Sequence, residues 1–143
     1  MGNHKLRVVL DTNVLLVSIS SKSQYHWVFE DLLNGRYELY ITNDILTEYE
    51  EIITAKFNAT VAQNVIRALL LFPNVHRAEV FYQWRLIMDD PDDNKFVDCA
   101  IAANADVIVT NDRHFRVLEV IEFPRVRAEE VEGFRKILQE EIS

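Results

Sequence analysis

The sequence predicts an α/β domain, a three-layer α/β/α sandwich in which helices cover both faces of a mostly parallel central sheet. Two observations favour this class. Short β-branched runs alternate along the chain with amphipathic helical patterns, and the 143 residues include only three Gly and three Pro, too few for an all-β protein with many tight turns. Neither a repeat nor a linker is evident, so we expect one domain over residues 1–143.

The first elements follow the order strand, helix, strand. Residues 7–11 form a β-branched run that ends in an acid, and residues 37–41 form a second run behind the turn pair Asn34-Gly35. Between them, apolar residues at i, i+3, i+4, i+7 and i+8 predict an amphipathic helix over residues 25–33, which Gly35 ends.

Two helices and a less regular segment come next. Thr42 or Asn43 caps a helix that continues to Lys56 and carries one apolar stripe. Another helix is expected over residues 60–72, where a proline follows it, and residues 75–82 predict a short strand.

The last third of the chain returns to the alternating pattern. The acidic stretch 89–93 predicts a loop that caps a helix over residues 94–104. The continuous apolar run within residues 105–110 predicts a buried strand. A weaker strand pattern spans residues 117–126, and a final amphipathic helix is expected over residues 128–141.

The charge balance limits the classes of function. The chain has 23 Asp and Glu against 15 Lys and Arg, a formal net charge of -8. This disfavours a protein that binds nucleic acid through a basic surface, but not a nuclease that meets phosphate through bound cations. The single Cys99 excludes an internal disulfide, and no stretch approaches the roughly 20 apolar residues of a membrane span. The polar N-terminus lacks the apolar run of a secretory signal, so we expect a soluble, cytoplasmic protein.

Two acids follow strands at positions where ligands commonly bind. Asp11 closes the first predicted strand, and Asp112 follows the strand within residues 105–110. Open α/β sheets bind ligands outside the carboxyl ends of their strands, so both carboxylates are expected at one edge. A helix cap or turn is the alternative role for each acid.

Helical geometry adds further candidates. In the helix over residues 43–56, Glu48 and Glu50 each lie roughly 100° from the centre of the apolar stripe, so periodicity does not choose between them. In the helix after the acidic stretch, Asp93 extrapolates onto the apolar stripe, whereas Asp98 points roughly 150° from its centre. Asp93 is therefore the better pocket candidate.

These acids lie within three segments, Leu10–Leu15, Asp90–Ala100 and Ala105–Phe115, and within the helix that carries Glu48. Together the segments resemble the PIN-domain ribonucleases, especially the VapC-like toxins of type II toxin–antitoxin modules. The resemblance implies that the catalytic and metal-binding acids are Asp11, Glu48, Asp93 and Asp112, with Asp98 as an auxiliary acid. An alignment shifted by one residue would place Asn94 in the third position.

The resemblance also implies hydrolysis of RNA phosphodiester bonds with Mg²⁺ or Mn²⁺. Four close carboxylates repel one another unless a cation lies among them, and hard divalent cations prefer oxygen ligands. The histidines, His4, His26, His76 and His114, show no zinc-ligand spacing. His114 stands where many family members carry a further acid.

Supporting roles and partners follow from the same resemblance. Hydrogen bonds from Thr12, Asn13 and Thr110 would position the site, although ordinary strand-end and cap bonding explains these residues equally well. Candidate contacts to the RNA backbone are Lys22, Lys95, Arg113, His114 and Arg116. The family pattern implies a homodimer and a cognate antitoxin protein.

Two other functions compete with a ribonuclease. Asp11 and the residues after it are similar to the opening of haloacid-dehalogenase-type phosphatases, but that family has a second Asp where this chain has Asn13. A PIN-like fold that only binds RNA or protein, without catalysis, is the remaining alternative. The presence of all four expected acids favours the enzyme.

Overall fold

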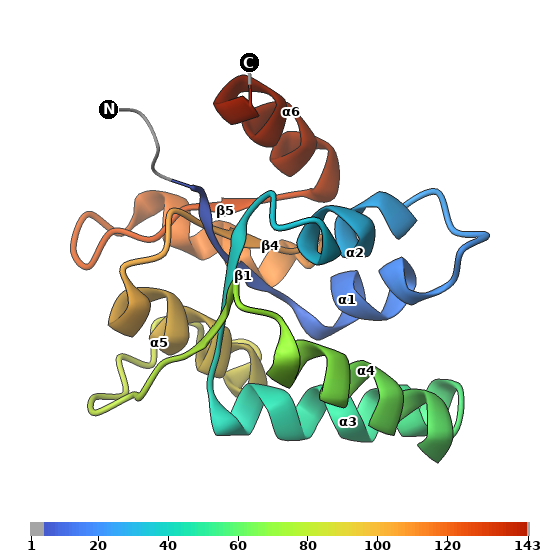
Figure 1. Ribbon diagram of the computed structural model, residues 1–143. Helices are drawn as coiled ribbons and strands as arrows, with labels where there is room; N and C mark the ends of the chain where they lie inside the picture. The colour runs from blue at the N-terminus through green and yellow to red at the C-terminus, as the bar shows by residue number, and fades with distance from the viewer. Residues whose placement is uncertain (1–4, 143) are drawn as a thin grey trace.

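The computed structural model of the protein describes residues 5–142, and its sheet has five parallel strands in the order β3-β2-β1-β4-β5 (Figure 1). His4 and most of the N-terminal stretch considered above lie outside the described residues. The strands are β1 (Arg7–Leu10), β2 (Glu38–Ile41), β3 (Val75–Arg77), β4 (Val107–Val109) and β5 (Ala128–Glu129). The helices are α1 (Thr12–Ile19), α2 (His26–Leu33), α3 (Asn43–Lys56), α4 (Ala59–Leu71), α5 (Asn94–Ala103) and α6 (Val131–Ile142), with the 3₁₀ helices η1 (Pro91–Asp93) and η2 (Arg113–Val120).

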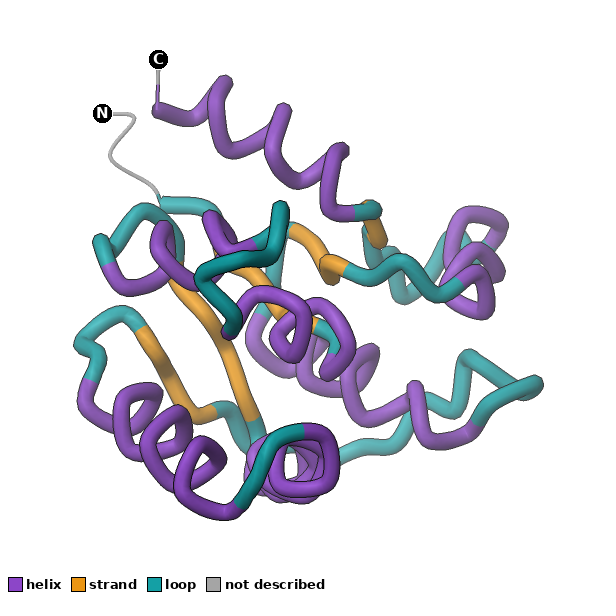
Figure 2. Tube along the Cα trace, turned by 90° about the vertical axis from the view of Figure 1, so that its right-hand side faces the viewer, coloured by secondary structure: helices purple, strands orange, loops and turns teal. Residues whose placement is uncertain are grey.

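Helices lie on both sides of the strands, which confirms the predicted three-layer α/β class. In Figure 1, α6 lies on the opposite side of the strands from α3, α4 and α5, and Figure 2 shows the strands between helices after a 90° turn. On the α6 side, the ring of Trp27 in α2 stacks on Phe134 of α6 with centroids 5.6 Å apart. The last three residues of β1 and all of β4 are buried, as expected for central parallel strands covered on both faces.

Most predicted elements are confirmed with small shifts at their ends. Thr42, rather than Asn43, caps α3, because its hydroxyl accepts a hydrogen bond from the Ile45 N–H at 3.2 Å. Gly35 follows α2 with a φ of 74°, a conformation that disfavours other residues. The third strand ends at Arg77 instead of continuing to residue 82.

Two regions differ from the prediction. Helix α1 was not expected, because its sequence is apolar in nearly every direction and so shows no amphipathic period; the helix packs between α2 and α3. The strand expected over residues 117–126 is wrong. Residues of η2 occupy its first part, with Phe115 and Leu118 buried three positions apart, which matches the three residues per turn of a 3₁₀ helix. The final helix begins at Val131 and not at residue 128, because Ala128 and Glu129 form β5.

The segment between β3 and η1, residues 78–90, contains no regular helix or strand and projects as a loop, yellow-green at the left of Figure 1. Helix α5 holds it through main-chain contacts. The Asn94 side chain binds both the N–H and the C=O of Ile87, at 2.9 and 2.8 Å, and Asp98 accepts a hydrogen bond from the Trp84 N–H at 3.0 Å. We call residues 78–90 the strap.

No helix among residues 5–142 is long and apolar enough to cross a membrane.

The buried side chain of Asn74 ties three elements together and provides a test of the fold. Its amide donates to the carbonyls of Leu32 and Tyr37, at 2.9 and 2.8 Å. Asn74→Ala removes both hydrogen bonds and leaves the Tyr37 carbonyl without this donor, whereas the Leu32 carbonyl keeps its bond from the Gly35 N–H. The free energy of unfolding should fall by about 1–3 kcal/mol in a urea titration. Asn64→Ala, at an exposed position of α4, should stay within about 0.5 kcal/mol of wild type. Equal effects of the two variants would contradict this role for Asn74.

Candidate metal centre

The carboxyl ends of β1 and β4 bring two acids together. The strands pair in parallel, with Leu10 opposite Val109, and the Asp11 N–H donates to the Val109 carbonyl at 3.0 Å. Asp11 and Asp112 therefore leave neighbouring strands at the same edge of the sheet. The Thr110 hydroxyl lies between them, because it donates to Asp11 Oδ2 at 2.7 Å and accepts from the Asp112 N–H at 3.0 Å.

Asp11 is buried, with 6% of its surface exposed. Burial raises the pKa of its carboxyl group, the hydrogen bond from Thr110 opposes this shift, and the nearby Asp112 carboxylate adds to it. A buried carboxylate beside another carboxylate is stabilised in its charged form by a neighbouring cation.

Four side chains form a compact cluster beside Asp11. Asp90, Asp93, Asp112 and His114 each offer one ligand atom, and these atoms lie within 4.8 Å of one another. His114 Nδ1 lies 3.2 Å from Asp112 Oδ1 and 3.8 Å from one oxygen each of Asp90 and Asp93. The residues come from local caps: Asp90 precedes η1, Asp93 ends η1 at the start of α5, and Asp112 caps η2.

The cluster contains polar atoms that lack partners. Within residues 5–142, Asp93 Oδ2 and His114 Nδ1 are buried and make no hydrogen bond. Burial and then the carboxylates of Asp112 and Asp90 raise the pKa of Asp93 to about 7. Buried polar groups normally have partners, so this donor set fits a divalent cation that would accept both atoms as ligands.

Glu48 occupies a different position from the four-residue cluster. One of its carboxylate oxygens accepts a hydrogen bond from the Thr12 hydroxyl, and the other is paired with the Lys95 ammonium. Glu50 was the alternative to Glu48 from the helical period. It is exposed and lies at the opposite edge of the apolar stripe of α3. The structure thus directs Glu48, not Glu50, toward α1 and α5.

Asp98 lies apart from the cluster, on the strap side of α5. The helical wheel directed it away from the apolar stripe, yet it is buried, because the strap covers that side of the helix and donates the Trp84 N–H to it. Burial raises the pKa of Asp98, and the Trp84 N–H opposes the shift. Asn94, the alternative to Asp93, also binds the strap through both polar atoms of its side chain.

The remaining predicted residues surround the centre at varying depth. Thr12 and Thr110 are buried and hydrogen-bonded to acids of the site, whereas Asn13 is exposed. Exposed cationic candidates are Lys22, Arg113 and Arg116, of which Arg116 lies 3.9 Å from Glu130.

Sequence reasoning did not place Asp90 or His114 among the ligand-bearing residues. Asp90 stood within an acidic run without a helical period. His114 showed no zinc-ligand spacing and stood where many family members carry a further acid, so it was proposed as a contact to RNA and not as a ligand. The available signal was local: both residues lie within two or three positions of an acid in a capping turn, which brings such neighbours onto one side.

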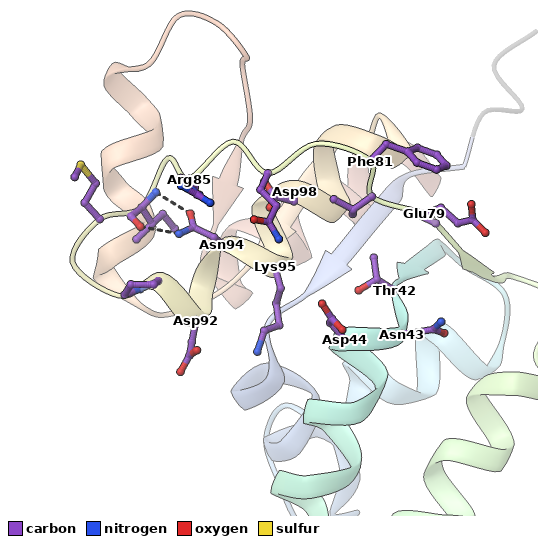
Figure 3. Close-up of a pocket in the computed structure, with 16 residues that line it drawn as sticks. Thr42, Asn43, Asp44, Glu79, Phe81, Arg85, Asp92, Asn94, Lys95 and Asp98 are labelled. Atoms are coloured by element: carbon purple, nitrogen blue, oxygen red, sulfur yellow. Dashed lines mark hydrogen bonds between the residues drawn. The ribbon is translucent and has the colours of Figure 1, made fainter.

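A cleft of about 740 Å³ lies between the start of α3, the strap and the start of α5 (Figure 3). Its lining includes Asp92 and Asn94, the neighbours of Asp93 in the chain, but none of the four residues of the cluster. Lys95 and Asp98 both line it, and Figure 3 shows Lys95 extending from α5 toward α3, away from the strap. Acidic residues at its rim include Asp44, Glu79 and Asp92.

Comparisons with known proteins agree with this architecture. Residues 7–114 match the model of the PIN domain family. The comparison with curated proteins finds no significant match.

Solved structures with a similar fold include three that contain toxins of the VapC class. The VapBC2 complex of Rickettsia felis, bound to a promoter DNA fragment, is 19% identical with a TM-score of 0.62, over 87% of this chain and 98% of that one. DNA-bound VapBC of Salmonella typhimurium is 20% identical with a TM-score of 0.58, over 88% and 98%. VapC20 of Mycobacterium tuberculosis, a toxin that cleaves the sarcin-ricin loop, is 14% identical with a TM-score of 0.60, over 80% and 97%.

These similarities show a common fold, and the family model covers most of the chain, including every acid of the centre. The resemblance found in the sequence is thereby confirmed. The chain belongs to the PIN domain family.

Proposed function

We propose that the protein is a nuclease that hydrolyses RNA phosphodiester bonds with a divalent cation held by Asp11, Asp93 and Asp112, with the His114 imidazole as a further ligand. The observation that carries this proposal is the pair of buried, unpartnered atoms, Asp93 Oδ2 and His114 Nδ1, among carboxylates at the carboxyl edge of the sheet. A purely structural cluster would pair these atoms internally.

The reaction requires an attacking water, a phosphate and a leaving oxygen. The bound cation supplies Lewis acidity, which lowers the pKa of a water and neutralises phosphate charge. The water oxygen bonds to phosphorus, the bond from phosphorus to the leaving ribose oxygen breaks, one water proton goes to that oxygen, and the other goes to solvent. Thr110 orients Asp11 and Asp112, and Asp98 contributes indirectly by holding the strap that continues into Asp90.

RNA as the substrate class is supported by the similar toxin that cleaves the sarcin-ricin loop. Arg113 and Arg116 are exposed on η2 directly after Asp112, so they are suitable contacts for phosphates beside the scissile bond, and Lys22 is a more distant candidate. The exposed Asn13 gives no support to a phosphatase that would need a second acid at that position.

The proposed biological role is that of a toxin in a toxin–antitoxin module of the cytoplasm. Two of the similar structures are VapBC complexes, and this supports an antitoxin partner. We extend the proposal to a homodimer, as the family resemblance implies.

The first test is cleavage of single-stranded and structured RNA with Mn²⁺ or Mg²⁺. Asp11→Asn should lower the cleavage rate at least about a hundredfold. The substitution removes the charge of a metal ligand, and the transition state loses several kcal/mol of stabilisation. EDTA should abolish cleavage, whereas Asp31→Asn, at a half-buried position of α2 where the carboxylate pairs with Arg36, should cleave like wild type. Full metal-dependent activity of Asp11→Asn would contradict the assignment, and RNA binding without cleavage by wild type would favour the non-catalytic alternative.

His114 should influence which cation binds. Mg²⁺ is bound almost entirely through oxygen, whereas transition metals accept imidazole nitrogen, so wild type should bind Mn²⁺ more tightly than Mg²⁺. His114→Ala should weaken Mn²⁺ binding by about tenfold or more and Mg²⁺ binding less, as measured by calorimetry. The control is replacement of His76, which lies in the edge strand β3 and pairs with Glu38 of the neighbouring strand β2. Equal losses for both cations in His114→Ala would exclude the imidazole as a ligand.

The raised pKa of Asp93 predicts a pH-dependent stability in EDTA. Between the ordinary value of 3.8 and about 7, the folded state retains a proton that the unfolded state has lost, so stability falls as pH rises through this window. Asp93→Asn cannot ionise and escapes that loss. In denaturant titrations, the free energy of unfolding of Asp93→Asn minus that of wild type should therefore increase from pH 4 to pH 7 and then level off. A difference independent of pH would show that Asp93 has an ordinary pKa.

A further inference from the structure

Lys95 places a positive charge between α5 and α3, beside Glu48. It is the second residue of α5, two positions after Asp93, and its ammonium is paired with Glu48 of α3. The side chains of Lys95 and Glu48 are each only 24% exposed. A partly buried ion pair that joins two helices holds the ammonium in place more firmly than an exposed surface lysine is held.

Glu48 is poorly placed to bind a cation itself. Both of its carboxylate oxygens are engaged, one by the Thr12 hydroxyl and one by Lys95, and it is absent from the four-residue cluster found within residues 5–142. A divalent cation on Glu48 would also lie next to the Lys95 ammonium, and like charges at such separations repel strongly in a partly buried site.

We propose that Lys95 takes the place of a second metal ion: the centre binds one divalent cation, and the Lys95 ammonium provides the second positive charge that contacts the scissile phosphate. This inference rests on the proposed nuclease function for its catalytic part. Glu48 and Thr12 act as positioning residues, because they fix the ammonium at the edge of the cleft between α3 and α5 (Figure 3). Lys95 neutralises charge on a non-bridging phosphate oxygen as the water oxygen bonds to phosphorus and the leaving oxygen departs.

A stabilising ion pair without a catalytic role is the competing explanation. Loss of such a pair would change stability but not the number of cations bound. The count of bound Mn²⁺ ions therefore separates the two explanations, and it can be measured without RNA.

The first experiment is Mn²⁺ titration of the folded protein by calorimetry and electron paramagnetic resonance. Wild type should bind one Mn²⁺, and Lys95→Met should bind two, because the freed Glu48 carboxylate becomes a ligand. Lys95→Arg, which keeps the charge, and Lys56→Met, a control at an exposed position of α3, should each bind one. The double variant Lys95→Met with Glu48→Gln should return to one. Two ions in wild type, or one in Lys95→Met, would overturn the proposal.

The second experiment measures single-turnover cleavage of a short RNA. Lys95→Met should slow the cleavage step by about a hundredfold, with RNA affinity in inert Ca²⁺ changed much less, since the lost charge acts chiefly in the transition state. Raised Mn²⁺ should partly restore its rate. If wild type does not cleave RNA, the proposed function fails while the Mn²⁺ count still tests Lys95. If wild type cleaves and Lys95→Met cleaves equally well, only the role of Lys95 fails.

Thermal unfolding of each variant accompanies both experiments. If Lys95→Met is unfolded, Lys95→Gln replaces it, since a neutral amide keeps a hydrogen bond to Glu48 without the charge. The same expected counts and the same contradicting results apply to that variant.

Discussion

The parallel pairing of β1 with β4 is the constraint on which the centre depends. Because Leu10 lies opposite Val109, the next residues of both strands leave the sheet together, and the Asp11 N–H still binds the Val109 carbonyl. A one-residue change in register would turn Asp11 to the other face of the sheet. Thr110 then links the two acids through one hydroxyl. The geometry of the acidic centre is thus an extension of backbone hydrogen bonding.

Helix α5 distributes different tasks to successive side chains. Asp93 at its start enters the acidic cluster, Asn94 binds the strap, and Lys95 reaches toward α3. Consecutive residues of a helix point about 100° apart, so three neighbours necessarily serve three surroundings. One turn later, Asp98 joins Asn94 on the strap side. The first turn of α5 therefore contributes Asp93 to the acidic cluster and Asn94 and Lys95 to the lining of the cleft.

The charges of the centre oppose the stability of the fold. Burial and mutual repulsion raise the pKa values of Asp11 and Asp93, so each carboxylate is held in an environment that disfavours its charged form. The hydrogen bond from Thr110 opposes part of the shift at Asp11, and a bound cation would offset the remaining repulsion. Such strain is tolerated where ligand binding relieves it, which is a common property of functional sites.

The α/β class, most element positions and the acids at the ends of β1 and β4 could be predicted from the sequence, because hydrophobic periodicity and strand ends are local properties of a chain. Helix α1 and η2 were not recognised, since a short helix without separate apolar and polar faces and a 3₁₀ helix lack the periods that sequence patterns display. Packing in three dimensions distinguishes Glu48 from Glu50, brings Asp90 and His114 to the centre, and buries Asp98 beneath the strap. These outcomes depend on which surface of each helix another segment covers, and that is fixed by packing between residues distant in sequence.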